Sequence, residues 1–508
     1  MKSKLTNILL ALILLLAAFM RLYKISDYMT FLGDEGRDVL IVKDILAGNL
    51  TFLGPRSSAG DFYTGPIYYY MMAPFLWLWR LDPVGPAIMI ALLGVATVFL
   101  IYHVGRKIFN PVVGLMAAAL YAVSPLVIIY SRSSWNPNPM PFFTLLILYL
   151  LYLGVQNKSW KYFLGVGVLY GIALQLHYIE LFVGVVIFSF ILFSFFYLKR
   201  REISLLLKQY ALTFVGFIVG VSPFLAFELR HGFPNSRTVI DLVLNGSPNA
   251  PDLTNKTFIQ IVQDVFFRVF GRTVWHFPSP DRMDLFDKNL LFLWQVLIVS
   301  VAFASIFFLL KHKDKLAVAL FGMWLGFGVI LFGFYKKPIN DYNFEFLFPL
   351  PFLLTAYFIS KLYCFKKLGV VGKVLGSALF VFLFGYNLYY LPFKNEPNRQ
   401  KDQIKSISEF VLSKTENKPF NFALITPGNS DHGYRYYFDI LGHPAVRIDT
   451  QLNDLERRTV TDQLLVVCEE TCNPEGNPLF DIAGFGPGKV EGEWQYSHVK
   501  VYKLIHEK

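Results

Sequence analysis

The fold of this chain is decided by residues 84–130, which read VGPAIMIALLGVATVFLIYHVGRKIFNPVVGLMAAALYAVSPLVIIY. Two apolar runs, each of about 20 residues and so long enough to cross a bilayer, are joined by a turn that holds Arg106 and Lys107. No other Lys, Arg, Asp or Glu occurs in this stretch. A pair of apolar runs joined by a basic turn predicts two membrane-spanning helices.

Similar apolar runs occur on both sides of this stretch. The first run ends in Met20-Arg21-Leu22 without a small-residue cleavage pattern, so we expect an uncleaved anchor rather than a signal peptide. The eleven candidate spans lie near residues 5–22, 84–104, 111–130, 139–155, 162–178, 179–198, 209–228, 289–310, 316–334, 343–360 and 374–391.

Composition supports a membrane protein. Of the 508 residues, 55% are hydrophobic and only 16% are charged, against about 25% charged in soluble domains. This excludes a soluble cytosolic enzyme, a collagen-like chain and a disordered chain. Three cysteines cannot form a disulfide framework, and no CxxC pair indicates a zinc site.

The basic residues of the short loops predict the orientation. With the N-terminus inside, the inner segments hold seventeen Lys and Arg and only two acids, Glu202 and Asp314. An odd number of spans then places the C-terminus outside, together with large outer loops at 23–83 and 229–288. We therefore predict a multi-pass α-helical membrane domain over residues 1–392.

The tail, residues 393–508, differs from this domain in character. Its formal charge is −3, against +14 for residues 1–392, so no separate basic domain is available to bind nucleic acid. An amphipathic stretch at 402–414 and short β-branched or apolar runs at 420–426, 463–467 and 498–504 predict a small extracytoplasmic α/β domain. Cys468 and Cys472 could form a local disulfide or remain two free thiols.

The first outer loop holds the densest group of candidate catalytic residues, Gly33-Asp34-Glu35-Gly36-Arg37-Asp38. Adjacent carboxylates resist ionising together, so one of them could serve as a general base, and Arg37 could grip a phosphate with its planar fork. The structural alternative is that Asp34 caps a helix starting near Glu35 and that Arg37 pairs with Asp34 at i, i+3.

Other outer segments offer candidate binding residues, each with a structural alternative. The stretch from Tyr68 to Trp79 predicts an in-plane helix whose aromatic side chains either anchor it at the interface or bind a lipid substrate. Arg132, Trp135 and Asn136 are candidates for binding a sugar or phosphate, against turn chemistry, and His177 with Glu180 for a divalent metal, against a hydrogen-bonded histidine. Tyr335, Lys336 and Lys337 could contact a phosphate or be only the positive flank of a span, and Asp341 and Glu345 could be structural partners of those lysines.

The order of these motifs resembles the bacterial branch of glycosyltransferase family 39, the GT-C enzymes related to protein O-mannosyltransferases and aminoarabinose transferases. The resemblance rests on the anchor span, the acidic pair, the Gly-Pro-Ile-Tyr-Tyr-Tyr helix from Gly65 and the Ser131 to Pro139 segment. It implies a polyprenyl-phosphate-linked sugar donor, transfer on the outer face, Asp34 as the essential acid with Glu35 beside it, and Arg37 near the lipid phosphate.

One departure from the aminoarabinose branch concerns the residues before the proline of this helix, where that branch has Glu-Lys and this chain has Thr64 and Gly65. Lys336 or Arg132 could supply the missing positive charge.

The predicted function is a membrane glycosyltransferase, transferring a hexose or pentose with inversion, with Asp34 as the general base. The alternatives are a polytopic transporter or flippase, which the absence of charges in the middle of the spans disfavours, and a non-catalytic assembly protein. The expected partners are the lipid-linked sugar, membrane lipids and a glycan, lipid or protein acceptor. No cofactor is implied with certainty, and a divalent metal stays open.

Overall fold

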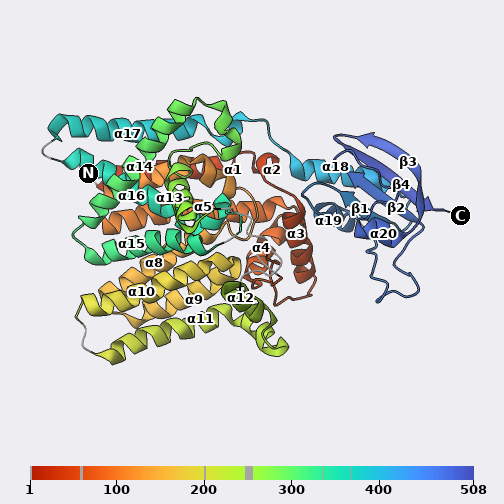
Figure 1. Cartoon of the computed structure of the whole chain (residues 1–508), viewed down its shortest axis with the longest axis horizontal. Coiled ribbons are helices and arrows are strands. Elements are labelled where there is room, and N and C mark those ends of the chain that lie inside the picture. Colours follow the sequence, from red (N-terminus) through yellow and green to blue (C-terminus); the bar gives the residue numbers. More distant parts are fainter. Residues whose placement is uncertain are drawn as a thin grey trace. The chain divides into compact units, whose positions relative to one another are not determined.

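The computed structural model describes residues 3–57, 61–199, 202–245, 256–335, 337–365 and 368–507. The chain divides into two compact units, each of which is described by itself (Figure 1). The helical unit comprises Met1–Tyr23, Thr51–Met71 and Ile88–Glu396, and the α/β unit comprises Lys24–Leu50, Met72–Ala87 and Pro397–Lys508.

Long apolar helices build the helical unit. Within the described residues, eight helices are long and apolar enough to cross a membrane, and a pair bent by 58°, η4 (Asp341–Leu347) with α16 (Pro349–Cys364), adds a ninth candidate. The eight contain α1 (Ser3–Leu22), α5 (Val84–Ile108), α8 (Met140–Asn157), α10 (Leu181–Tyr197), α11 (Ile203–His231), α14 (Lys288–Leu310), α15 (Lys315–Ile330) and α17 (Gly369–Tyr389).

Two shorter apolar helices, α6 (Pro111–Val123) and α9 (Trp160–Leu176), occupy the remaining predicted positions. Each of the eleven predicted runs therefore corresponds to an apolar helix or helix pair, which confirms the helical membrane-protein class. The number of crossings stays a prediction, because length and apolarity alone do not establish one.

Shorter elements connect these helices. The helix expected over the aromatic stretch is α4 (Ile67–Leu78), whose last residues belong to the α/β unit. The others are η1 (Tyr178–Glu180), α7 (Pro125–Tyr130), α12 (Pro234–Asn245), α13 (Phe258–Gly271), η2 (Pro280–Leu285), η3 (Leu331–Phe334) and η6 (Pro392–Lys394).

Helices α9 and α11 make an unusually close contact through glycine. A Cβ atom added to Gly167 would lie 2.0 Å from the carbonyl oxygen of Thr213, and one added to Gly220 would lie 2.2 Å from that of Val168. Glycines four residues apart on both helices let the two backbones touch, as is common between helices in membranes. This contact fixes the orientation of α9 against α11. The C-terminal end of α9 is Leu176.

The α/β unit contains a four-stranded sheet in the order β1-β2-β4-β3 (Figure 1). Strands β1 (Asn421–Ile425) and β2 (Gln463–Cys468) are parallel, and β4 (Val499–His506) runs antiparallel to both β2 and β3 (Gly488–Tyr496). The runs predicted at 420–426, 463–467 and 498–504 correspond to β1, β2 and β4. Strand β3 was not predicted, because the glycines and glutamates of Gly488–Tyr496 have low strand propensity.

Helices α2 (Ile25–Tyr28), α3 (Gly33–Leu46), α18 (Gln400–Ser413), α19 (His432–Ile440) and α20 (Phe480–Phe485) complete this unit. The amphipathic stretch expected at 402–414 is α18. Helix α3, which carries the acidic pair, packs against α19. Residues Lys24–Leu50 and the C-terminal tail thus contribute to one compact unit.

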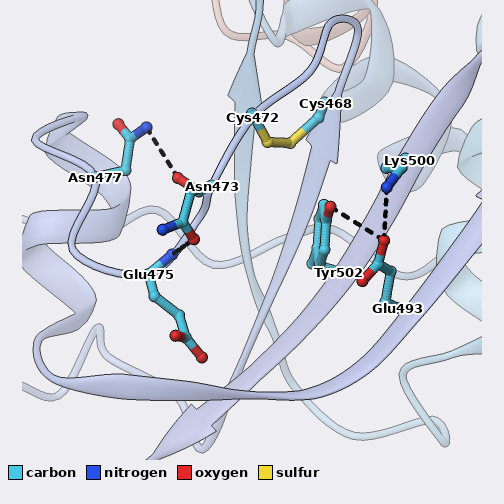
Figure 2. The surroundings of a disulfide bond; sticks show 8 residues. All are labelled: Cys468, Cys472, Asn473, Glu475, Asn477, Glu493, Lys500 and Tyr502. Carbon is cyan, nitrogen blue, oxygen red and sulfur yellow. Dashed lines mark hydrogen bonds and ion pairs between the residues drawn. A yellow bond between two sulfur atoms is a disulfide. The ribbon is translucent and has the colours of Figure 1, made fainter.

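The structure decides between the two alternatives for the cysteines of the tail. Cys468, at the end of β2, and Cys472 form a disulfide, with the chain turning between them (Figure 2). Cys468 is 1% exposed and belongs to the apolar core under the sheet. The bridge therefore holds the loop after β2 against that core.

Candidate active site

The acidic pair lies on the first turn of α3, and its two carboxylates have different surroundings. The Asp34 side chain is 55% exposed, whereas Glu35 is only 6% exposed. Adjacent positions on a helix point about 100° apart, so one carboxylate is open to solvent while its neighbour is buried. Of the two, Asp34 is the carboxylate that solvent reaches.

Glu35, not Asp34, caps the helix. Helix α3 begins at Gly33, earlier than expected, so Glu35 is its third residue and reaches back to accept a hydrogen bond from the Leu32 N–H at 3.0 Å. Burial, aided by the charges of Asp34 and Asp38, raises the pKa of Glu35 to about 7. The expectation that Asp34 provides the cap was therefore wrong.

Arg37 forms ion pairs with carboxylates on either side of it. Its guanidinium donates to Asp34 Oδ1 at 2.8 Å and, through two nitrogens, to Asp38 Oδ1 at 2.9 and 2.7 Å. The pairing with Asp34 at i, i+3 is confirmed. A phosphate at Arg37 would have to share the guanidinium with these carboxylates or displace one of them.

Arg132 and Asn136 hold helix ends in the helical unit. Arg132 is 2% exposed and donates to the carbonyl oxygens of Met20 and Tyr23 at 2.8 and 2.6 Å, at the C-terminal end of α1. Asn136 donates to the carbonyl oxygen of Leu176, the last residue of α9, at 2.5 Å. Carbonyls at helix ends lack partners within the helix, so both side chains have a structural task.

Trp135 and His177 are brought together around Tyr342. Their rings lie 4.5 Å and 6.2 Å from that of Tyr342, both edge to face. His177 Nδ1 accepts a hydrogen bond from the N–H of Ile179 at 3.3 Å, and its ring stacks on Tyr178. The hydrogen-bonded form expected for this histidine is therefore present.

The other candidates of the helical unit have separate partners. Tyr68 is buried and shares a 2.8 Å hydrogen bond with Ser134. Glu180 accepts from Thr144 at 2.7 Å. Among the described residues, no group of three or more His, Cys, Asp or Glu side chains could hold a metal ion.

Lys336 lies outside the described residues. Asp341 was considered as a partner of the neighbouring lysines, but its carboxylate instead accepts hydrogen bonds from Arg268 at 2.5 Å and from Arg272 at 3.0 Å. Arg272 lies one helical turn after Arg268, at the end of α13. The two guanidinium groups can therefore bind both oxygens of one carboxylate.

The helical unit also holds a mainly apolar cavity of about 300 Å³ between α9, α11, α12 and the segment Phe62–Gly65. Gln175 is one of the polar residues that line it. The amide nitrogen of this side chain donates to the carbonyls of Gly171 and Gly220, whereas the oxygen is buried and has no hydrogen-bond partner. Gln175 was not predicted as a site residue, because a lone glutamine in an apolar run gives no signal of an unsatisfied acceptor.

The sequence-predicted residues therefore fall into two sets. Asp34, Glu35 and Arg37 lie within one turn of α3 in the α/β unit, whereas Tyr68, Arg132, Trp135, Asn136 and His177 lie in the helical unit.

Comparison with known proteins identifies the fold. Residues 64–227 match the family model described as dolichyl-phosphate-mannose-protein mannosyltransferase. No curated protein sequence matches the chain significantly.

Three solved structures cover most of the chain. ArnT from Cupriavidus metallidurans, bound to undecaprenyl phosphate, matches with a TM-score of 0.62 at 10% identity over 99% of this chain and 98% of its own. The oligosaccharyltransferase AglB from the archaeon Archaeoglobus fulgidus, in complex with a peptide and a dolichol-phosphate, gives 0.54 at 12% identity over 92% and 69%. The mycobacterial arabinofuranosyltransferase AftD gives 0.54 at 13% identity over 100% and 40%.

The family match thus confirms the resemblance over residues 64–227, which do not include the acidic pair, and the ArnT match shows the shared fold. The family match begins at Thr64 and covers the α4 helix and the Ser131 to Pro139 segment, and the ArnT match extends over nearly the whole of both chains. The protein is a multi-pass membrane protein with the GT-C glycosyltransferase fold, and its residues 64–227 carry the sequence pattern of the dolichyl-phosphate-mannose-protein mannosyltransferase family.

Proposed function

We propose that this protein transfers a sugar from a polyprenyl-phosphate-linked donor to an acceptor on the outer face of the membrane. The observation that carries this proposal is the exposed carboxylate of Asp34 on the first turn of α3, in a chain that shares its fold from end to end with a protein solved in complex with undecaprenyl phosphate.

In the proposed mechanism Asp34 is the general base. Its carboxylate takes the proton of the acceptor hydroxyl while the acceptor oxygen attacks the anomeric carbon, and the bond from that carbon to the phosphate oxygen breaks, so the lipid phosphate leaves with the electron pair. Phosphate is a good leaving group, so no acid partner is required. A single displacement of this kind inverts the anomeric centre.

Glu35 supports the base rather than replacing it. Because its pKa is raised to about 7, Glu35 is largely neutral below that pH, and the acidic pair then carries one negative charge instead of two. Its hydrogen bond from Leu32 also keeps the first turn of α3 wound, which fixes the backbone that carries Asp34.

The proposed binding residues divide by their contacts. Arg37, 21% exposed and next to Asp34, is proposed to meet the donor phosphate, and the Trp135 and His177 rings are proposed to contact the sugar or its carrier. Arg132 and Asn136 are proposed to position these groups through the helix ends that they hold. Tyr68 and Lys336 complete the proposed set.

The apolar cavity is proposed to take part of the polyprenyl chain. Its walls come from α9 and α11, two apolar helices of the membrane domain, and from α12. Burying apolar chain surface in such a cavity contributes roughly 25 cal/mol per Å², which supports a lipid rather than a water-soluble donor.

The outer location of residues 393–508 is also part of the proposal. The Cys468–Cys472 disulfide supports it, because structural disulfides persist mainly outside the reducing cytosol. The basic inner turns support the same orientation. The division of the chain at residue 392 into a membrane domain and an outer domain belongs to this proposal as well.

The test is mass spectrometry of surface glycans and glycolipids from cells with and without the gene, followed by turnover of the purified protein with the sugar donor so identified. We expect one molecule of polyprenyl phosphate to be released for each sugar transferred. Movement of a substrate across liposomes without consumption of any lipid-linked sugar would instead indicate a transporter.

A further inference from the structure

Within the α/β unit, the N-terminus of α3 is pressed against the segment 429–433 of the tail. The N–H of Gly33 donates to Asn429 Oδ1 at 2.8 Å. A Cβ atom added to Gly33 would lie 1.9 Å from Ser430 Oγ, and one added to Gly36 would lie 2.3 Å from the backbone nitrogen of Gly433. The turn that carries Asp34 and Glu35 therefore touches the tail directly, at a distance that no larger residue allows.

Asn429 is held in one orientation by its own partners. Its Oδ1 also accepts from the N–H of Ser430 at 2.8 Å, and its Nδ2 donates to Glu469 Oε1 at 3.4 Å. With two donors on the oxygen and an acceptor on the nitrogen, the amide has no equivalent flipped arrangement. Two of the three contacts that orient this amide come from the tail itself.

Glu469 is fixed in turn. Its carboxylate accepts from Thr426 Oγ1 at 2.7 Å and from the Tyr434 hydroxyl at 3.0 Å, and its N–H donates to the carbonyl of Ile425 at 3.0 Å. It directly follows Cys468, whose disulfide to Cys472 closes the same loop (Figure 2). A continuous set of contacts leads from the disulfide to the residue before Asp34.

We propose that Asn429 is a positioning residue for Asp34, which it holds in place through the N–H of Gly33, and that Glu469 and the disulfide loop keep Asn429 in its orientation. This inference rests on the proposed function, because it needs Asp34 to be the base. It assigns the tail a part in the reaction, through its contact with the backbone that carries Asp34.

A small displacement of the catalytic base lowers the reaction rate more than the loss of one hydrogen bond lowers the stability of the fold. One hydrogen bond to a helix N–H contributes only about 1 kcal/mol net to stability, but a base displaced by about 1 Å can lose on the order of 10²-fold in rate. Loss of the Asn429 contact leaves the N–H of Gly33 unsatisfied and lets the first turn of α3 shift.

The central variant is Asn429→Ala, with Asn421→Ala as its matched control. Asn421 lies in the same unit and also makes several hydrogen bonds, to the carbonyls of Val446 and Thr459 and from Thr461. None of these partners belongs to α3. The control therefore removes a comparable amount of bonding from the unit without touching the acid-bearing turn.

Three measurements are made on the full-length protein: product formation in gene-deleted cells at matched expression, affinity of the purified protein for undecaprenyl phosphate, and hydrogen exchange of the Gly33 amide. For Asn429→Ala we expect product formation to fall on the order of 10- to 100-fold, unchanged affinity for undecaprenyl phosphate and faster exchange at Gly33. Asn421→Ala should keep the wild-type rate of product formation per folded molecule. Hydrogen exchange of its Gly33 amide should remain as slow as in the wild type.

A rescue variant separates positioning from folding. In the double variant Asn429→Asp with Glu469→Gln, the amide at position 469 donates a hydrogen bond to the carboxylate at position 429, the reverse of the wild-type bond. A carboxylate oxygen at position 429 still faces the N–H of Gly33. The pair should recover most of the lost rate, whereas Asn429→Asp alone, which places two carboxylates together, should not.

Equal rate losses in Asn429→Ala and Asn421→Ala at equal unfolding temperatures would overturn the inference. So would full activity of Asn429→Ala while Asp34→Asn is inactive, and in that case the proposed function would stand. Full activity of Asp34→Asn would instead overturn the catalytic assignment, and the inference with it.

Discussion

At the scale of the residue, two neighbouring acids differ because the helix turns one toward solvent and the other inward. The sequence indicates the pair and the mutual repulsion of its charges, and it correctly predicts the ion pair of Asp34 with Arg37. It does not reveal that Glu35 is buried, because that burial depends on segments far away in the chain.

The raised pKa of Glu35 predicts a pH-dependent stability. Burial favours the neutral acid, so the stabilisation is fully present below the unfolded pKa of 4.5 and is lost as the pH rises through about 7. At about 1.4 kcal/mol for each pKa unit, the loss is on the order of 3 kcal/mol. Thermal unfolding of the purified protein between pH 5 and pH 8.5 should show it, and Glu35→Gln should flatten the curve.

Asp34→Asn is the matched control, because Asp34 is the exposed member of the pair. This variant should keep the pH dependence of unfolding that Glu35 causes. Parallel unfolding curves for the wild-type protein and Glu35→Gln across this pH range would contradict the buried state of Glu35.

Arg37 gives a second prediction at this scale. Lysine keeps the charge but loses the planar fork, so Arg37→Lys should weaken binding of undecaprenyl phosphate more than it lowers turnover. Arg56→Lys is the control, because Arg56 is an exposed arginine of the same outer loop that pairs with Asp61. Unchanged affinity in Arg37→Ala would remove the phosphate contact and leave Arg37 as an ion-pair partner of Asp34 and Asp38.

At the scale of the element, long apolar runs predicted the helices well because a bilayer imposes their length and composition. The strand β3 was missed and the start of α3 was placed two residues late. Residues 490–496 of β3 do alternate between polar residues and apolar residues or glycine, but their glycine and glutamates have low strand propensity. A cap supplied from inside the helix, as by Glu35, looks in the sequence like any first-turn acid.

The cavity beside α11 gives a prediction for this element. Ile218 lines it, so Ile218→Trp should fill the space and weaken binding of undecaprenyl phosphate by about tenfold, the equivalent of 1.4 kcal/mol. Val215, on the same helix, is 52% exposed and does not line the cavity, and Val215→Trp should leave the affinity unchanged. Equal affinities for both variants would exclude the cavity as a site for the lipid chain.

At the scale of the whole molecule, charge asymmetry predicts the orientation, and a native residue can report it. Cys364 is the free cysteine, is exposed, and is the last residue of α16, in a segment predicted to face inside. A membrane-impermeant thiol reagent should label Cys364 only in opened vesicles, and should label Leu452→Cys, at an exposed position of the tail, in intact cells. Labelling of Cys364 from outside would reverse the proposed orientation.

Which segments of the chain form the α/β unit could not be predicted from the sequence. Its sheet follows from the tail alone, but α3 joins it from a position nearly 400 residues earlier. The contact depends on glycines, Gly33 and Gly36, which in the sequence resemble ordinary loop residues. Close backbone approach leaves no periodic pattern, so only the three-dimensional structure shows that the acidic pair and the tail share one unit.

The proposed role of Asp34 as the general base is tested by the rate of sugar transfer in Asp34→Asn. Asparagine preserves side-chain size but cannot accept the acceptor proton near neutral pH, so the account predicts a loss of about 10²- to 10⁴-fold with an unchanged unfolding temperature and unchanged binding of undecaprenyl phosphate. Full transfer by Asp34→Asn while Glu35→Gln is inactive would show that the buried carboxylate is the base, and full transfer by both variants would contradict the catalytic role of this loop.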